Sequence, residues 1–520
     1  MGLAKNISTV GGFTLLSRVF GLIRDLATAR YLGAGMAADA FVIAFKLPNF
    51  FRRLFAEGAF SVGFVPLFAR ALGKEITPES KAAAEAFAGR VLAWLLPVLL
   101  IFLIIMEIGM MPIMLGLTGG FDGDDTKFNF VIELGRYTFP YLVLISLVSF
   151  FGGMLNAYGR YSAAAFAPVL LNVSMIAALF FFGENDMEAA RALAIGVSVA
   201  GVAQLILLYA TARRAGIRLK LPRPRLSEDV KELLIIIGPA AVGAGIMQIN
   251  LLIDVILAAR FLPEGSVTWL FYADRLNQLP LGAIGIAVGT VLLPSISRQL
   301  ASGDEKGANK QQNKALDFSL FLTLPAAVAL AVIAAPILAT LFERGQFLSG
   351  DTSATAAALT VYALGLPAYV IAKTLTPGYF ARKDTKTPVR YAVVALVINT
   401  VLNIILIRYF AHVGLAGATA IAAWVNAGLL YIGLKKRGHL TLLSETKVKI
   451  AKYALASLIM GAVVVFAAGQ LKGFFIEDGW VRILALTALV AAGGFSYLGT
   501  VFTVGGITVK EIKAFKDPAG

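Results

Sequence analysis

Arginine side chains inside apolar stretches are the residues of this sequence whose chemistry is clearest. Arg18, Arg24 and Arg52 lie near the start of the chain and Arg275 lies in its second half, each within a run apolar enough for a bilayer. A charge near the centre of a membrane is costly unless it has water, a partner or an anionic ligand. The guanidinium fork holds phosphate oxygens in a bidentate way and keeps its charge when desolvated. We therefore predict that these four residues bind a polyanion, most simply a pyrophosphate, in a water-filled cavity.

Further charges accompany these arginines on the same stretch of chain. An ideal helix would place four of them on one stripe that partly neutralises itself: Asp39, Lys46, Arg53 and Glu57. Asp25, Arg53 and Glu57 are secondary candidates for the cavity. Long charged side chains can also reach the membrane interface from within a helix, and this second explanation stays open for Lys46, Arg53 and Arg30.

A second group of polar residues carries oxygen atoms rather than cations. Asp254, Asn399, Asn403 and Thr419 all lie within apolar runs of the second half. Carboxylate, amide and hydroxyl oxygens suit a hard monovalent cation, so we predict that this group forms a Na⁺ site for a coupling ion. Hydrogen bonding between helices, which is common for Asn and Thr in membrane bundles, is the alternative. We expect no other metal and no organic cofactor.

Composition places the chain among polytopic membrane proteins. Of its 520 residues 58% are hydrophobic and 15% are charged, and the mean hydropathy is +0.80. A soluble domain has about 25% charged residues. The apolar runs are long and lack the alternation of barrel strands, so we expect an all-α protein. The net charge of +15 lies mostly in short loops, which indicates membrane orientation rather than nucleic-acid binding.

The elements that must position these residues are about 14 spanning helices of bilayer length. Loops after even-numbered segments are rich in Lys and Arg, whereas those after odd-numbered segments are not, which predicts that both termini are cytoplasmic. The segments are expected at 8–32, 37–64, 86–112, 131–157, 162–182, 190–212, 232–260, 267–295, 316–338, 355–380, 388–408, 413–434, 450–470 and 481–503.

An internal repeat organises these segments. ARYLGAG at 29–35 matches ARFLPEG at 259–265, and LLYATARRAG at 207–216 matches LLYIGLKKRG at 429–438. Segments 1–6 and 7–12 are thus two copies in the same orientation, and such copies enclose a site near the midplane of the membrane. We predict an N-lobe at 1–216, a C-lobe at 217–438 and a third part at 439–520 that holds the last two helices and the C-terminus.

Several long motifs resemble the MurJ/MviN family of lipid II flippases, which belongs to the MOP exporter superfamily. The strongest are SRVFGLIRD at 17–25, ADAFVIAFKLPNFFRRLFAEGAF at 38–60, AFAPVLLN at 165–172 and YADRLNQLPLGAIGIAVGTVLLP at 272–294. The resemblance implies two six-helix lobes around a cavity, with two further helices forming a groove for the lipid tail. It also implies that Arg18, Arg24, Arg52 and Arg275 are functional cavity cations, with Asp39 as their acidic partner.

The same resemblance implies what is transported. Lipid II, the undecaprenyl-pyrophosphate-linked precursor of peptidoglycan, would move from the cytoplasmic to the outer leaflet of the bacterial inner membrane by alternating access. Membrane lipids would be its other partners, and we expect a monomer. The alternatives are a MATE-like cation-coupled exporter, a flippase for another polyprenyl-pyrophosphate-linked saccharide, and a membrane-embedded enzyme. The sequence shows neither the catalytic carboxylate pair or His of such an enzyme nor the acidic, aromatic cavity of a MATE exporter, so a transporter of lipid II is predicted.

The orientation can be tested by cysteine labelling, which is clean because the chain has no native Cys. We expect a single Cys at position 123 to react with an impermeant maleimide added to intact cells. A single Cys at position 218 should react only after the membrane is permeabilised, because the basic loops are predicted to be cytoplasmic. The reverse labelling pattern would show that the predicted topology is inverted.

Overall fold

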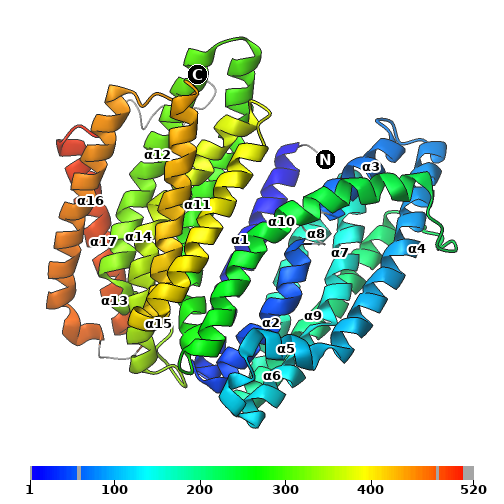
Figure 1. Cartoon of the computed structure of the whole chain (residues 1–520), viewed down its shortest axis with the longest axis horizontal. Coiled ribbons are helices and arrows are strands. Elements are labelled where there is room, and N and C mark those ends of the chain that lie inside the picture. The colour runs from blue at the N-terminus through cyan, green and yellow to red at the C-terminus, as the bar shows by residue number, and fades with distance from the viewer. Residues whose placement is uncertain (1–2, 55–59, 476–478, 508–520) are drawn as a thin grey trace. The chain divides into compact units, whose positions relative to one another are not determined.

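The computed structural model describes residues 3–54, 60–475 and 479–507, and within these ranges the chain is helical with no β-strand. The predicted all-α class is therefore confirmed. A bilayer requires that every backbone polar group be hydrogen-bonded within the protein. Helices meet this requirement while their apolar side chains face the lipid. The helices follow one another through short connections (Figure 1).

The chain forms two compact units. The first consists of residues 1–268 together with 344–347, and the second consists of residues 269–343 and 348–520. The lobes predicted from the repeat divided the chain at 216 instead. The compact division differs because the helix that opens the second copy, α10 (Glu228–Phe261), packs against α2, α3, α4 and α5 of the first unit. The two sequence copies therefore meet at a different point of the chain from the two compact units.

The first unit is a bundle in which α8 contacts both α1 and α9, α7 contacts α9, and α2 contacts α6. Pro239 lies within α10, where a missing backbone N–H and a steric clash favour a bend, and α10 bends along its length in Figure 1. The helices of the unit before α10 are α1 (Leu3–Leu32), α2 (Met36–Phe51), α3 (Phe60–Leu72), α4 (Pro78–Ile108), α5 (Met110–Thr118), α6 (Asp125–Thr138), α7 (Tyr141–Ala157), α8 (Ser162–Phe182) and α9 (Asp186–Arg214).

The second unit is built around α14, which packs on α12, α13 and α15, while α16 packs on α12 and α17. Its core includes Tyr379, whose hydroxyl donates to the Leu430 carbonyl at 2.8 Å. The helices are α11 (Ser266–Ala301), α12 (Glu305–Val332), α13 (Ala334–Leu341), α14 (Ser349–Phe380), α15 (Lys386–Lys436), α16 (Ser444–Gln470) and α17 (Trp480–Thr503).

Each predicted spanning segment overlaps these helices, but 86–112, 131–157 and 316–338 each cross the boundary between two of them. Within the described residues, 9 helical stretches are long and apolar enough to cross a membrane. Segments 388–408 and 413–434 belong to the single run α15, but Ala411 has φ 48 and ψ −132, so the helix breaks between them as expected. The segment predicted at 37–64 is wrong as one regular helix, because α2 ends at Phe51 and α3 begins at Phe60, with residues 55–59 outside the described ranges.

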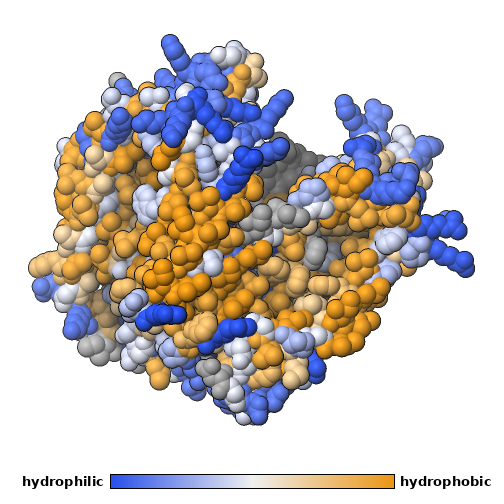
Figure 2. Space-filling model, in the orientation of Figure 1, coloured by the Kyte–Doolittle hydropathy of each residue, from blue (hydrophilic) through white to orange (hydrophobic). Residues whose placement is uncertain are grey.

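Apolar side chains cover the outside of the bundle. On α4 the exposed residues include Val98, Ile101, Ile105 and Ile108, as expected for a helix in contact with lipid. Figure 2 shows hydrophobic residues over much of the visible helix surface and hydrophilic residues gathered near helix ends. The surface therefore has the polarity of a protein solvated by a bilayer.

Two glycines allow the 344–347 segment to contact the end of α1 closely. Gly33 and Gly345 both have positive φ, at 64 and 62, and the backbone N–H of Gln346 donates to the Arg30 carbonyl at 3.0 Å. A Cβ at position 345 would lie 2.3 Å from the Arg30 carbonyl oxygen, and one at position 33 would lie 2.4 Å from the Gln346 carbonyl oxygen. Only glycine fits at either position, so the 344–347 segment is held tightly against the end of α1.

We predict that Gly345→Ala destabilises the protein by at least about 1–2 kcal/mol, the cost of a Cβ in the left-handed region, before the steric clash is added. Its thermal unfolding temperature in detergent should fall. Gly350→Ala is the matched control, because Gly350 is helical and no atom lies within 4 Å of its ideal Cβ. Equal unfolding temperatures for the two variants would contradict the proposed fit.

Candidate functional site

Arg24 is the buried cation of the candidate site. Arg24 is 9% exposed. Its guanidinium donates to the Asp25 carboxylate through Nη2 at 2.5 Å and to the Asn172 side-chain oxygen through Nη1 at 2.9 Å. The Asn172 amide in turn donates to the Ser17 carbonyl at 3.1 Å. This network joins α1 to α8 and gives the buried charge both a counter-ion and a neutral acceptor. Arg24 and Asp25, predicted separately, thus form one ion pair.

The other predicted cations of the first unit are more accessible. Arg18 is exposed on α1, Arg52 is half-buried directly after α2, and Arg53 is exposed. Residues 52–54 form a wider π-helical turn, a feature that often marks functional sites. The ideal-helix register that placed Arg53 on the stripe with Asp39 is therefore wrong beyond Phe51, although Lys46 remains within α2. Glu57, a secondary candidate, lies outside the described residues.

Arg275 lies in the second unit, where it is half-buried on α11. Three of the four predicted substrate-binding arginines therefore belong to one unit and the fourth to the other. Their convergence on one ligand stays a prediction. Arg30, predicted near an interface, is exposed in the last turn of α1, and the hydrogen bond described above uses its backbone carbonyl.

Asp39 has a different environment from the one predicted for a partner of cavity cations. It is 3% exposed, and its carboxylate accepts hydrogen bonds from the Gly265 N–H at 2.8 Å, the Thr268 N–H at 2.9 Å and the Thr268 hydroxyl at 2.7 Å. These donors belong to the start of α11, whose first backbone N–H groups have no partner within the helix. Asp39 therefore caps the first residues of α11, 266–268, which belong with α2 to the first unit, and its carboxylate lies at the positive end of the helix dipole.

Asn399, Asn403 and Thr419 lie together within α15. The Asn403 amide donates to the Asn399 side-chain oxygen at 2.9 Å, and the Asn399 amide donates to the Thr419 hydroxyl at 3.2 Å, across the break at Ala411. Three of the four predicted ligands are thus neighbours, in the pattern expected for hydrogen bonding between helices. Asp254 lies on α10 in the first unit and is half-buried. Sodium binding stays a prediction.

Asn172 was not selected as a site residue from the sequence, although a signal was present. It interrupts the apolar run AFAPVLLN, and Asn399 occupies the matching position of the second copy. Both amides are buried, at 5% and 1% exposure, and both hydrogen-bond a side chain of another helix segment. A polar side chain repeated at one position of two apolar helices indicates a buried hydrogen bond.

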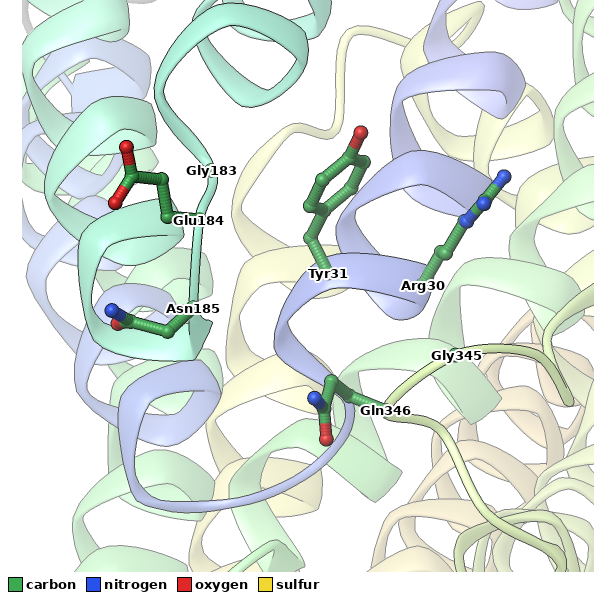
Figure 3. A pocket seen from close by; sticks show the side chains of 7 residues that line it. All are labelled: Arg30, Tyr31, Gly183, Glu184, Asn185, Gly345 and Gln346. Carbon is green, nitrogen blue, oxygen red and sulfur yellow. The ribbon is translucent and has the colours of Figure 1, made fainter.

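A small pocket lies elsewhere in the first unit. It has a volume of about 200 Å³ and is lined by Arg30, Tyr31, Gly183, Glu184, Asn185, Gly345 and Gln346. In Figure 3 the Arg30 and Glu184 side chains point away from each other, with the Tyr31 ring between them. None of the predicted substrate-binding residues lines this pocket. Its volume is also below the roughly 300–1,000 Å³ of typical ligand pockets, so we do not assign the substrate to it.

Comparison with known proteins identifies the family. The family model described as lipid II flippase MurJ matches residues 28–486. The chain belongs to the lipid II flippase MurJ family. A probable lipid II flippase MurJ of Rhizobium meliloti (strain 1021) is 44% identical, over 99% of this chain and 96% of its own length. The lipid II flippase MurJ of Burkholderia cenocepacia is 38% identical over 84% of this chain and 85% of its own length.

Solved structures agree with this family and its fold. A lipid II flippase MurJ in an inward closed conformation is 27% identical, with a TM-score of 0.77, and the match covers 94% of this chain and 97% of that one. An inward-facing MATE-family transporter of the MOP superfamily is 17% identical with a TM-score of 0.66, covering 82% and 97%. That second likeness shows the fold alone. The MurJ family consists of transporters, so the chain is a multi-pass membrane transporter and not an enzyme, as predicted.

The cap at Asp39 leads to a stability prediction. Asp39→Ala should lower the free energy of unfolding by roughly 3 kcal/mol, because it removes three accepted hydrogen bonds and leaves their donors without an acceptor. Thr268→Val removes one of the three and should cost about 1 kcal/mol. Thermal unfolding of the purified protein measures both. Glu184→Ala, which removes an exposed carboxylate, is the control; an effect of Asp39→Ala no larger than that of the control would refute the capping role.

Proposed function

We propose that this protein moves lipid II from the cytoplasmic to the outer leaflet of the bacterial inner membrane by alternating access. Membership of the MurJ family supports the substrate, and the relatives named above carry that activity in their names. The likeness to MOP-superfamily transporters supports alternating access. Both termini are assigned to the cytoplasm on the alternation of loop charge.

The observation that carries the proposal is the excess of cations over acids on α1 and the turn after α2. Asp25 pairs with Arg24, and Arg18 on α1 and Arg52 and Arg53 in the turn after α2 are further cations of this unit. Like charges near one another in an apolar protein repel strongly, and a polyanion or water relieves this repulsion. The pyrophosphate of lipid II supplies negative charge in a compact group whose oxygens match the guanidinium fork. The charges of this region thus suit the head of the lipid rather than its tail.

The contacts of Arg24 support a response to such a ligand. Its guanidinium donates through Nε and Nη2 to one oxygen of Asp25, at 3.1 and 2.5 Å, and through Nη1 to Asn172. A pyrophosphate would compete with the adjacent Asp25 for the same donors. Because Asn172 holds Arg24 from α8, that exchange changes the contacts between α1 and α8. A ligand shifts a conformational equilibrium only through different contacts in the two states, and this network offers such a difference.

We predict that replacing Arg18, Arg24, Arg52 or Arg275 individually by Ala abolishes lipid II translocation while the protein still folds and inserts. Lys should restore activity only in part, because it keeps the charge but loses the bidentate fork. A leaflet-accessibility assay for lipid II, in cells that depend on the variant, measures the effect. Expression level and unfolding temperature show whether each variant is folded.

Arg30→Ala is the control for these variants. Arg30 is also an arginine on α1, but it is exposed in the last turn, so its replacement should leave translocation near the parent level. If well-expressed Ala variants of Arg18, Arg24 and Arg275 all sustained normal translocation, the cationic mechanism would be wrong.

A further inference from the structure

The connection between α9 and α10, residues 215–227, is a basic segment of extended chain, which we call the basic ledge. It carries no acidic residue, and the side chains of its four cations are all exposed: Arg218, Lys220, Arg223 and Arg225. In the parts of the chain that the structure describes, the acids nearest the ledge pair with other cations: Glu85 with Lys81, Glu228 with Lys231, Asp229 with Arg90 and Glu232 with Arg70. The ledge therefore presents positive charge that neighbouring acids do not neutralise.

The first half of the ledge is fixed to the bundle. Ile217 is 2% exposed, and its N–H donates to the Ala212 carbonyl at 3.0 Å. The Arg218 N–H donates to the Glu85 carboxylate on α4 at 3.1 Å. A Cβ at Gly89 of α4 would lie 2.2 Å from the Lys220 carbonyl oxygen, so the two backbones touch. The cations are thus displayed from a rigid base rather than from a loose loop.

The contact with Gly89 sets the depth of the ledge in the membrane. From Val91 to Met106, α4 is without a charged residue, and Arg90 is the last charge before this run. The 16 residues of this run span about 24 Å at 1.5 Å per residue, most of the roughly 30 Å of a hydrocarbon core. Gly89 therefore lies at the boundary of that core, which places Lys220 at the level of the lipid headgroups.

The second half of the ledge has the composition of an interfacial segment. Leu221 is 60% exposed and Leu226 is 50% exposed, and they flank the sequence PRPR. Pro222 and Pro224 favour an extended chain without internal hydrogen bonds, whose side chains project on more than one side. Exposed leucines beside cations are unfavourable in water but suit a membrane surface, where apolar groups enter the acyl boundary and cations meet phosphates. Figure 1 shows the connection between α9 and α10 beside α4, and Figure 2 shows hydrophilic residues projecting at that edge.

We propose that the basic ledge is a binding site for anionic phospholipid headgroups of the adjoining leaflet. The four cations bind headgroup phosphates, and Leu221 and Leu226 enter the interface beside them. Clusters of four to eight basic residues next to a spanning helix bind anionic lipid in this way, with about 1 kcal/mol for each cation near the surface. The ledge also joins the two copies of the repeat, so bound lipid holds this junction at the membrane surface. This inference does not depend on the identity of the transported substrate.

Lipid binding by the full-length protein tests the proposal. We expect native mass spectrometry of the purified protein to show tighter binding of phosphatidylglycerol than of phosphatidylcholine. Replacing all four ledge cations by Gln should weaken phosphatidylglycerol binding at least about tenfold, given the energy per cation near a charged surface. The control removes the same charge from exposed residues of the second unit, by Gln at Arg298, Lys306, Lys310 and Lys314. It should change binding less than about twofold, because these side chains project from α11 and α12 without exposed leucines beside them.

A depth measurement keeps the test independent of folding. We expect a fluorophore on Leu221→Cys, in nanodiscs with phosphatidylglycerol, to be quenched by lipids spin-labelled at the headgroup. The same fluorophore on Lys306→Cys should be quenched far less. Unchanged phosphatidylglycerol binding after loss of the ledge cations would overturn the proposal, and so would an equal loss in the control. An unquenched label at position 221 would also overturn it.

Discussion

The cost of a charge without a partner in apolar surroundings is the constraint on which this structure depends. Among the described residues the buried charged side chains are Arg24, Asp25, Asp39 and Arg482. Each has a specific solution. Arg24 and Asp25 pair with each other, Asp39 caps α11, and Arg482 donates to the Ala339 carbonyl at 2.9 Å near the end of α13. Buried charge in this fold is therefore tied to places where helices start, end or cross.

The same constraint separates structural charges from those available to a ligand. The Asp39 carboxylate accepts three hydrogen bonds from the start of α11, which gives it a structural role as a helix cap. Arg18 is exposed and Arg52 is half-buried, in the unit where Arg24 is already paired. Among the described residues of α1 and the turn after α2, arginines outnumber acids. A polyanionic ligand is favoured by this excess, and a cationic drug is not.

The sequence was sufficient to predict the helices and insufficient to predict their polar partners. Long apolar runs and loop charges located the helices because both signals are local. The partners of Asp39 lie 226 and 229 residues away, and no periodicity connects them. The π-helical turn at residues 52–54 was also missed, because a stripe drawn at ideal spacing assumes a regular helix. The grouping of Asn399 and Thr419 was predictable because the break between their helix segments is short.

Divergence between the two copies explains why the cations are concentrated in one of them. By the offset of ARYLGAG and ARFLPEG, Arg24 corresponds to Asp254, and Asp39 corresponds to Trp269. Trp269 donates to Asp351 at 2.9 Å, so a neutral donor now occupies the position of the capping acid. The partner helices differ as well: α1 packs on α8 within the first copy, whereas α10 packs on α2, α3, α4 and α5. A duplicated scaffold in which one copy exchanged an arginine for an acid no longer offers two equal sites for an anion. We therefore expect the first copy to supply most of the contacts to the proposed polyanion, with Arg275 as the predicted contribution of the second.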